Sequence, residues 1–190
     1  MDSHISRERR ETLLGQRGAV VWFTGLPGAG KSTLATTLEE WLIENGKLAY
    51  LLDGDKVRCG LNRDLTFSTR DREENIRRIA EVANLLSDCG VICISAFISP
   101  FDKSRQFVED VVGRERTFIV YVSTPIELCE RRDPKGLYAK ARRGEILDFT
   151  GIDSPYEVPQ SPRLTLNTAE LSKEQCLEQL LGMLRTAGVV

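Results

Sequence analysis

The sequence predicts an α/β protein with a doubly wound, mostly parallel sheet. Apolar segments of strand length alternate with amphipathic helical segments along most of the 190 residues. That order is typical of a parallel sheet covered by helices on both faces. In addition, the first apolar segment, residues 19–23, runs directly into a glycine-rich loop that opens a helix. Ligands of such sheets bind at the carboxyl ends of the strands, so this loop is expected to lie at the site.

The glycine-rich loop reads Gly25-Leu26-Pro27-Gly28-Ala29-Gly30-Lys31-Ser32 and matches G-x-x-x-x-G-K-[ST] at every position. Small residues let backbone N–H groups close around phosphate oxygens, and the helix N-terminus adds partial positive charge. The pattern predicts that Lys31 reaches the β- and γ-phosphates of ATP and that Ser32 binds Mg²⁺. The alternative is a chance turn before a helix. The expected ATP-binding residues are Gly25, Gly28, Ala29, Gly30, Lys31, Ser32 and Thr33.

Further strands and helices follow in alternation, which predicts the topology of P-loop nucleoside-triphosphate hydrolases. We expect the later strands at residues 47–52, 91–98, 118–122 and 164–166. Helices are expected after the phosphate loop up to Asn45-Gly46, from 68 to 90, and through 107–112. Two more follow the capping-box patterns Thr124-x-x-Glu127 and Ser172-x-x-Gln175.

Length and composition indicate one globular domain. Hydrophobic residues make up 41% and charged residues 28%, as in ordinary soluble domains. We expect a charged N-terminal arm at 1–17, favoured as solvated, and one kinase domain at 18–190. The polar N-terminus has no secretory pattern and the longest apolar stretch is too short for a bilayer, which predicts a cytoplasmic protein without a membrane partner. A net charge of −2 argues against nucleic acid as a partner, and five scattered cysteines argue against a zinc site.

Between 131 and 162 the periodic pattern breaks down into a basic, Gly- and Pro-containing stretch. Long loops of this kind in compact domains are usually functional or disordered. We interpret residues 133 to about 158 as a mobile lid that brings positive charge over phosphates. The alternative is a solvated basic face.

The acidic motif Asp53-Gly54-Asp55 follows the second strand, beside arginines that could hold a second anion. The chain lacks the Asn-Lys-x-Asp that reads guanine, and its third strand does not end in an acid as in motor ATPases. This arrangement favours a small-metabolite kinase. A kinase for another small acceptor, or a non-catalytic nucleotide-binding module, are the alternatives, although such a module would be expected to lose Lys31 or the acids.

Several motifs together resemble the adenylylsulfate kinase family, in order and spacing from about residue 18 to about 160. They are the phosphate loop, Asp53-Gly54-Asp55, Val57-Arg58, Gly60-Leu61-Asn62, Asp71-Arg72, Glu74-Asn75-Ile76-Arg77-Arg78, Ile98-Ser99-Pro100, residues 132–138 (RDPKGLY), Ala141-Arg142 and residues 149–157 (FTGIDSPYE). The resemblance implies transfer of the ATP γ-phosphoryl group to the 3′-hydroxyl of adenosine 5′-phosphosulfate (APS), giving 3′-phosphoadenosine 5′-phosphosulfate for sulfate activation. It further implies Mg²⁺ and a homodimer.

The resemblance also implies a set of site residues. Arg132 would cover the donor adenine. Acceptor-side residues would be Asp55, Arg58, Phe67, Arg72, Asn75, Ile98, Ser99, Lys135, Leu137, Phe149 and Ile152. Phe67 and Phe149 suit the two faces of the acceptor base, and the guanidinium groups of Arg58 and Arg72 suit the phosphosulfate. The alternative for these arginines is surface salt bridging to Asp71 or Glu73.

Besides Lys31, three residues are candidates for a role in the reaction: Asp55, Asp53 and Ser99. Asp55 is the first choice to orient a water on Mg²⁺ or to accept the 3′-hydroxyl proton, and Asp53 is the second; the alternative is a turn whose acids accept backbone N–H bonds. Ser99 falls where members of this family are commonly assigned a phosphoserine. A serine nucleophile needs a base, and the only histidine, His4, lies in the arm. We therefore expect Ser99 to position substrate and not to be obligatorily phosphorylated.

Overall fold

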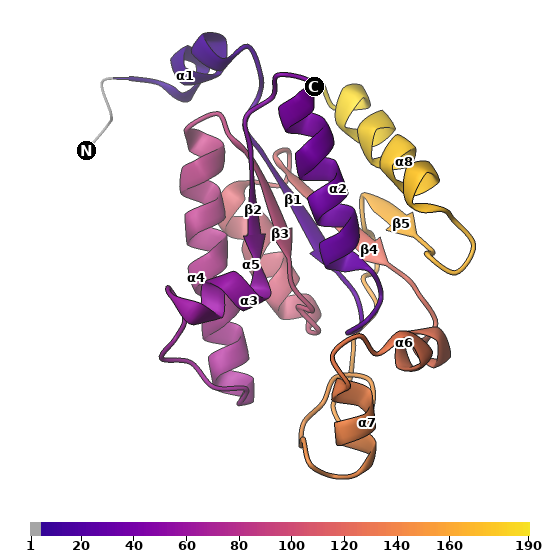
Figure 1. Cartoon of the computed structure of the whole chain (residues 1–190). Helices are drawn as coiled ribbons and strands as arrows, with labels where there is room; N and C mark the ends of the chain where they lie inside the picture. Colours follow the sequence, from indigo (N-terminus) through magenta and orange to yellow (C-terminus); the bar gives the residue numbers. More distant parts are fainter. Residues whose placement is uncertain (1–4) are drawn as a thin grey trace.

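A five-stranded, fully parallel sheet forms the centre of the computed structural model, which describes residues 5–190 (Figure 1). The strands lie in the order β2-β3-β1-β4-β5. The expected doubly wound fold is confirmed. His4, which belongs to the expected N-terminal arm, lies outside the described residues. The strand bounds are β1 Ala19–Thr24, β2 Ala49–Asp53, β3 Ile92–Ala96, β4 Thr117–Val122 and β5 Leu164–Leu166.

Long helices cover both faces of the sheet (Figure 1). Val21 and Phe23 of β1 pack with α2 (Lys31–Glu44) and α8 (Lys173–Thr186). The alternate residues Val20 and Trp22 pack with α4 (Thr69–Asp88) and α5 (Asp102–Val112). Because both faces of β1 are buried, its sequence is continuously apolar and not alternating. The short helices are α1 Arg7–Leu14, α3 Gly54–Cys59, α6 Ile126–Arg132 and α7 Leu137–Arg142.

The strand register brings the ends of three strands to one edge. Phe23 of β1 and Asp53 of β2 both pair with Ala96 of β3. The phosphate loop, the acidic motif and the segment before Pro100 therefore leave the sheet together. This edge is where a parallel sheet offers a ligand site.

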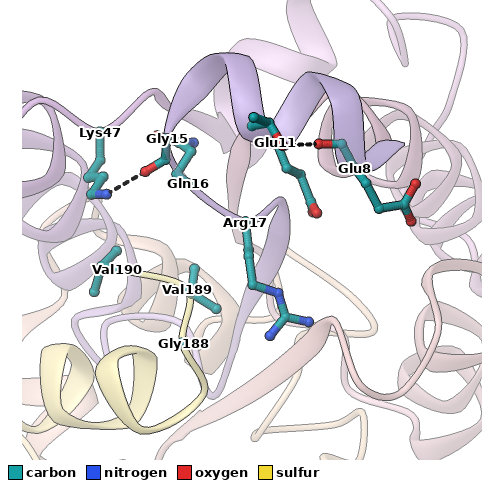
Figure 2. Close-up of a pocket in the computed structure, with 10 residues that line it drawn as sticks. Glu8, Glu11, Gly15, Gln16, Arg17, Lys47, Gly188, Val189 and Val190 are labelled. Atoms are coloured by element: carbon teal, nitrogen blue, oxygen red, sulfur yellow. Dashed lines mark hydrogen bonds between the residues drawn. The ribbon is translucent and has the colours of Figure 1, made fainter. Parts of the chain in front are cut away.

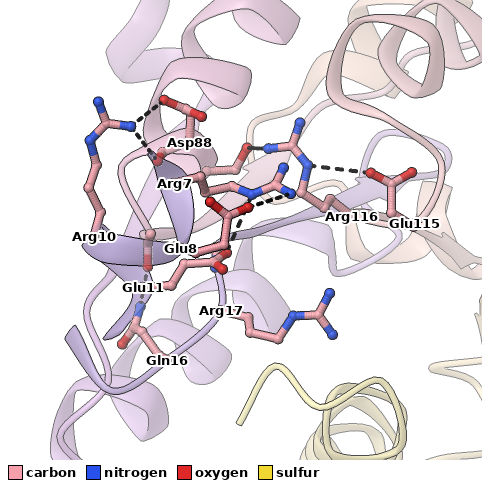
Figure 3. A network of polar contacts seen from close by, with 12 residues as sticks. Arg7, Glu8, Arg10, Glu11, Gln16, Arg17, Asp88, Glu115 and Arg116 are labelled. Atoms are coloured by element: carbon pink, nitrogen blue, oxygen red, sulfur yellow. Dashed lines mark hydrogen bonds and ion pairs between the residues drawn. The ribbon is translucent and has the colours of Figure 1, made fainter. Parts of the chain in front are cut away.

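Residues 7–16 are attached to the opposite edge of the sheet, so this part of the arm is not free in solvent (Figure 3). Although α1 buries no side chain, Arg10 forms an ion pair with Asp88 at 2.8 Å. The buried side-chain amide of Gln16 donates to the carbonyls of Leu48 and Gly90 at 2.9 and 2.7 Å. The segment is thus anchored to the sheet, although Gln16 is the one residue of 7–16 that is buried.

Two helix starts differ in how they are capped. The box Ser172-x-x-Gln175 is confirmed, with both reciprocal hydrogen bonds present. The box expected from Thr124 is wrong, because Pro125 is the N-cap of α6 and the Thr124 hydroxyl donates to the Ala29 carbonyl at 2.9 Å. Within the described chain, no helix is long and apolar enough to cross a membrane.

Candidate active site

A cavity of about 1130 Å³ lies at the carboxyl edge of the sheet, between the phosphate loop, α3, the start of α4, the end of β3 and the 133–158 segment. Most of the residues expected from the sequence line it. Gly25, Ala29 and Ile152 do not; Ile152 packs against the hydrophobic core. The lining residues that were expected are Gly28, Gly30, Lys31, Ser32, Thr33, Asp53, Asp55, Arg58, Phe67, Arg72, Asn75, Ile98, Ser99, Arg132, Lys135, Leu137 and Phe149.

Glycine is required in the phosphate loop by close packing as well as by backbone angles. Gly25 has a φ of 147°, and a Cβ there would lie 2.5 Å from the Val122 carbonyl oxygen. Gly28 has a φ of 75°, and a Cβ there would lie 2.9 Å from the Cys129 carbonyl oxygen. Side chains at either position would push the loop away from β4 and α6.

Lys31 is the first residue of α2 and is buried beneath the loop that precedes it. Its Nζ donates to the carbonyls of Gly25 and Leu26 at 2.8 and 2.7 Å. Burial lowers the pKa of Lys31 to about 8. A triphosphate in the loop would supply the anionic partner that Lys31 lacks among these contacts.

The two acids of the Asp53-Gly54-Asp55 motif have different partners. Asp53 caps α3 by accepting from the Asp55 backbone N–H at 3.0 Å, and its other oxygen accepts from the Ser32 hydroxyl at 3.1 Å. The exposed Asp55 carboxylate forms an ion pair with Lys135. The cap made by Asp53 agrees with the alternative interpretation of this motif, a turn whose acids accept backbone N–H bonds. It uses only one carboxylate oxygen of Asp53, however, and no oxygen of Asp55.

The acceptor end of the cavity is basic and aromatic. The Arg58 guanidinium lies 4.4 Å from the centre of the Phe67 ring, and Phe67 is 65% exposed. Partial burial and then the nearby positive charge of Arg72 lower the pKa of Arg58. Two neighbouring cations beside an exposed ring are a suitable arrangement for an anionic nucleotide.

Arg72 contacts the lid and not the acids beside it. Its guanidinium donates to the Phe67 carbonyl at 2.8 Å, to the Asp148 carbonyl at 2.5 Å and to the Thr150 hydroxyl at 3.1 Å. Asp71 instead accepts from the backbone and hydroxyl of Thr66. The salt bridge to Asp71 or Glu73 that was the alternative is absent among the described ion pairs.

The Ser99 hydroxyl is directed into the protein. Ser99 is 2% exposed, and its Oγ accepts from the Trp22 indole N–H at 3.1 Å. Asn75 is also buried, and its side-chain oxygen accepts from Asn62 at 2.9 Å. Both residues lie on the cavity wall with fixed side chains.

Sequence reasoning missed the donor-side wall that follows β5. Thr168 accepts from Arg132 at 2.8 Å and donates to the Ala29 carbonyl at 3.0 Å, which ties the end of β5 to the phosphate loop. The signal was available, because Thr168 lies just beyond the carboxyl end of β5, at the same edge of the sheet as Asp53, the last residue of β2. Other unpredicted lining residues near it are Leu171, Lys173 and Cys176.

A second, open cavity of about 470 Å³ lies at the other end of the molecule, between α1 and the C-terminal residues (Figure 2). Its two cations already have backbone partners: Lys47 donates to the Gly15 carbonyl at 2.9 Å and Arg17 to the Ala187 carbonyl at 3.2 Å. These contacts are structural, so the large cavity remains the candidate active site.

Several known proteins are similar to this chain in sequence and in structure. A family model described as adenylylsulphate kinase matches residues 17–167. An adenylyl-sulfate kinase of Clostridium acetobutylicum is 52% identical over 185 residues, which are 97% of this chain and 92% of that protein. The APS kinase CysC of Mycobacterium tuberculosis, solved in complex with AMPPNP and APS, is 49% identical with a TM-score of 0.86 and covers 90% of this chain and 99% of its own. A hexameric APS kinase from Thiobacillus denitrificans is 32% identical with a TM-score of 0.71, over 95% of this chain and 30% of that one.

Proposed function

Because this chain belongs to the adenylylsulphate kinase family, we propose that its large cavity aligns ATP with adenosine 5′-phosphosulfate. The protein is an ATP-dependent kinase that phosphorylates APS on its 3′-hydroxyl, a step of sulfate assimilation. The observation that carries the assignment of the site is the continuity of the cavity. Its lining runs without interruption from the phosphate loop to Arg58, Phe67 and Arg72.

The donor end would hold the ATP phosphates. Backbone N–H groups of the loop and of the first turn of α2 surround the phosphate position, and Lys31 supplies the buried positive charge. On binding, Lys31 would exchange the two loop carbonyls for phosphate oxygens. In this reaction type, rate acceleration comes mainly from positioning and charge stabilisation, which these groups provide.

The residues present fit a magnesium ion. A hydroxyl and a carboxylate, those of Ser32 and Asp53, lie 3.1 Å apart beside the phosphate loop. Mg²⁺ typically takes one or two such oxygens together with water and substrate phosphates. Bound there, Mg²⁺ would neutralise phosphate charge. This geometry favours Asp53 over Asp55, our first choice from the sequence, as the partner of Ser32.

The acceptor end would hold APS between aromatic and cationic groups. Phe67 and Phe149 would contact the base, while Arg58 and Arg72 would bind the phosphosulfate. Asp55 would then accept the 3′-hydroxyl proton, once the nucleotide displaces its contact with Lys135. Direct transfer needs only that the hydroxyl and the γ-phosphorus be aligned.

A substrate panel tests this function. ATP consumption is measured with APS, shikimate, nucleosides and gluconate in parallel, with Lys31→Ala as the control variant. We expect consumption with APS alone and a loss of at least ~10²-fold in Lys31→Ala, the scale of removing one preorganised charge partner. Preference for another acceptor, or no consumption with any, would support the two alternative classes instead.

We propose a homodimer in the cytoplasm. The hexameric APS kinase from Thiobacillus denitrificans, which is 32% identical, supports assembly from several copies. All five cysteines are free thiols, as expected in a reducing compartment. Light scattering coupled to gel filtration measures the subunit number, and cell fractionation the location.

A further inference from the structure

Arg105 is a buried arginine directly behind the cavity wall. It is 3% exposed and does not line the cavity. Its guanidinium donates to the Ser99 carbonyl at 2.7 Å, to the Glu157 carbonyl at 2.7 Å and to the Asp102 carboxylate at 2.9 Å. Arg105 thereby connects the segment after β3, the end of the lid and the first turn of α5.

The Ser99 backbone is in a conformation that needs such support. Its φ is 38°, in the left-handed region that residues other than glycine rarely adopt. Such a conformation persists only where surrounding groups hold it. Three side chains hold Ser99: Arg105 and, at 3.3 Å, the Thr24 hydroxyl donate to its carbonyl, and the Trp22 indole donates to its hydroxyl. The wall residues on either side, Ile98 and Pro100, depend on this turn for their direction.

The end of the lid is fixed to the same wall. The Glu157 backbone N–H donates to the Pro100 carbonyl at 2.8 Å, and its carboxylate accepts from the Asp102 backbone N–H at 2.6 Å. The Arg105 guanidinium also lies 5.8 Å from the centre of the Tyr156 ring. A shift at Arg105 would therefore move the wall and the lid end together.

Stability alone is a poor explanation for Arg105. Among the described ion pairs its carboxylate partner is Asp102, which is 57% exposed, and its buried Nε has no hydrogen-bond partner. A buried charge with incomplete partners is weak evidence for stabilisation. The planar fork is instead suited to holding two carbonyls from separate segments at fixed positions.

We propose that Arg105 is a positioning residue of the acceptor site, which fixes the Ser99 turn and the C-terminal end of the lid relative to each other. This inference rests on the proposed function, because the wall that Arg105 holds is the one assigned to APS. Its effect is on acceptor binding and alignment. The donor end, built by the phosphate loop and Arg132, does not depend on it.

The test compares Arg105→Met and Arg105→Lys with a matched control, Arg116→Met. Arg116 is also a largely buried arginine, donating to the Val112 carbonyl and, at 3.1 Å, to the Ser87 hydroxyl, but at the opposite edge of the sheet (Figure 3). We expect Arg105→Met to raise the KM for APS at least ~10-fold, the scale of one hydrogen bond to a charged group. The KM for ATP should stay within about twofold. Arg105→Lys should show a smaller rise, and Arg116→Met should lower only the melting temperature.

A spectroscopic readout makes the test independent of turnover. In a Trp41→Phe background, Trp22 is the remaining tryptophan, and its indole reports on Ser99 through their hydrogen bond. We expect a changed Trp22 emission in the Arg105 variants and none in Arg116→Met. Unchanged emission and an unchanged KM for APS in a folded Arg105 variant would overturn the proposal, and Arg105→Lys decides if Arg105→Met does not fold. Failure of the wild-type protein to phosphorylate APS would instead reject the proposed function.

Discussion

Lys135, which precedes α7, forms an ion pair with Asp55 of α3, and both side chains line the large cavity. Asp53, two residues earlier, has no such cationic partner among the described ion pairs and instead accepts from Ser32. The two acids of this short motif therefore face different groups: Asp53 faces the phosphate loop and Asp55 faces the lid. We expect the two carboxylates to have different roles, Asp53 in binding magnesium and Asp55 in accepting the proton.

Asp53→Asn and Asp55→Asn should separate those roles. We expect Asp53→Asn to raise the Mg²⁺ concentration needed for half-maximal rate at least ~10-fold, because it removes a carboxylate beside Ser32. Asp55→Asn should lower kcat by ~10² or more at saturating Mg²⁺, the range of a lost general base. Rates measured across a magnesium titration check both. If Asp55→Asn changed only the magnesium requirement, the assignment of the two acids would be reversed.

ATP binding should take up a proton at alkaline pH. Burial lowers the pKa of Lys31 to about 8, so at about pH 9 the amine is mostly neutral in the free protein and becomes protonated beside triphosphate. At about pH 6.5 it is already charged, and no uptake is expected. Calorimetry in buffers of different ionisation enthalpy measures the uptake.

The lowered pKa of Lys31 also predicts how the stability of the folded protein changes with pH. The unfolded chain holds the Lys31 proton more tightly than the folded one, so the Lys31 contribution to stability should rise as pH increases from about 8 to the ordinary value of 10.5. Lys31→Met should abolish both the uptake and this pH dependence. Equal uptake in Lys31→Met would assign the proton to another group.

Arg58→Ala and Arg72→Ala should weaken APS far more than ATP. Each arginine lies at the acceptor end, so its loss alters the binding of one substrate; we expect the KM for APS to rise at least ~10-fold. Arg77→Ala on α4 is the control, since Arg77 is exposed and pairs with Glu74 at 2.7 Å. Separate KM values for the two substrates are the measurement. An equal rise in both would place the arginines outside the acceptor site.

The 133–158 segment should become protected when nucleotides bind. We propose that it closes as a lid, because Lys135 and Arg72 connect it to α3 and α4 at the cavity. Trypsin should cut after Lys135, Lys140 and Arg142 more slowly with ADP plus APS present. Cleavage after Arg9, at the far edge of the sheet, is the internal control. Rates that stay equal at both places would argue against a lid.

The fold was predictable because its signals are local. β1 is apolar on both faces, and the phosphate loop marks the carboxyl edge of the sheet. The capping box of Ser172 and Gln175 predicts where α8 begins. The six-residue helices α3 and α7 were missed, because so short a segment has no helical periodicity to read. The capping box predicted at Thr124 was wrong because the Thr124 hydroxyl donates to the Ala29 carbonyl of the phosphate loop. Spacing in the sequence does not show such a distant contact.

The sequence predicted which residues form the site better than it predicted which of those residues contact one another. The phosphate-loop pattern and the family resemblance together predicted most of the side chains that line the cavity. Whether Asp53 or Asp55 lies beside Ser32, and whether Arg105 faces the cavity or lies behind it, depends on contacts between segments far apart in the chain. The same holds for Thr168, which meets the phosphate loop across 139 positions of sequence.

Ser99→Ala should retain activity. Ser99 is buried and its hydroxyl accepts from the Trp22 indole N–H, so the hydroxyl is held inside the protein. No His, Asp or Glu hydrogen-bonds to it among the described contacts, and a serine without a base is a weak nucleophile. We expect a loss in kcat of about tenfold or less, together with a loss of stability of about 1–3 kcal/mol, because the buried indole N–H loses its acceptor.

Two further measurements make the Ser99 prediction decisive. Ser99→Gly removes the hydroxyl but tolerates the φ of 38°, so it separates the loss of the hydroxyl from backbone strain. Rapid quenching of the wild-type enzyme during turnover, followed by mass spectrometry, shows whether phosphoserine forms. A phosphoserine that appears and decays as fast as turnover, with no activity in either variant, would establish the covalent route. Activity in Ser99→Gly would leave direct transfer between ATP and the 3′-hydroxyl as the mechanism, since Ser99 then contributes only the shape of the wall.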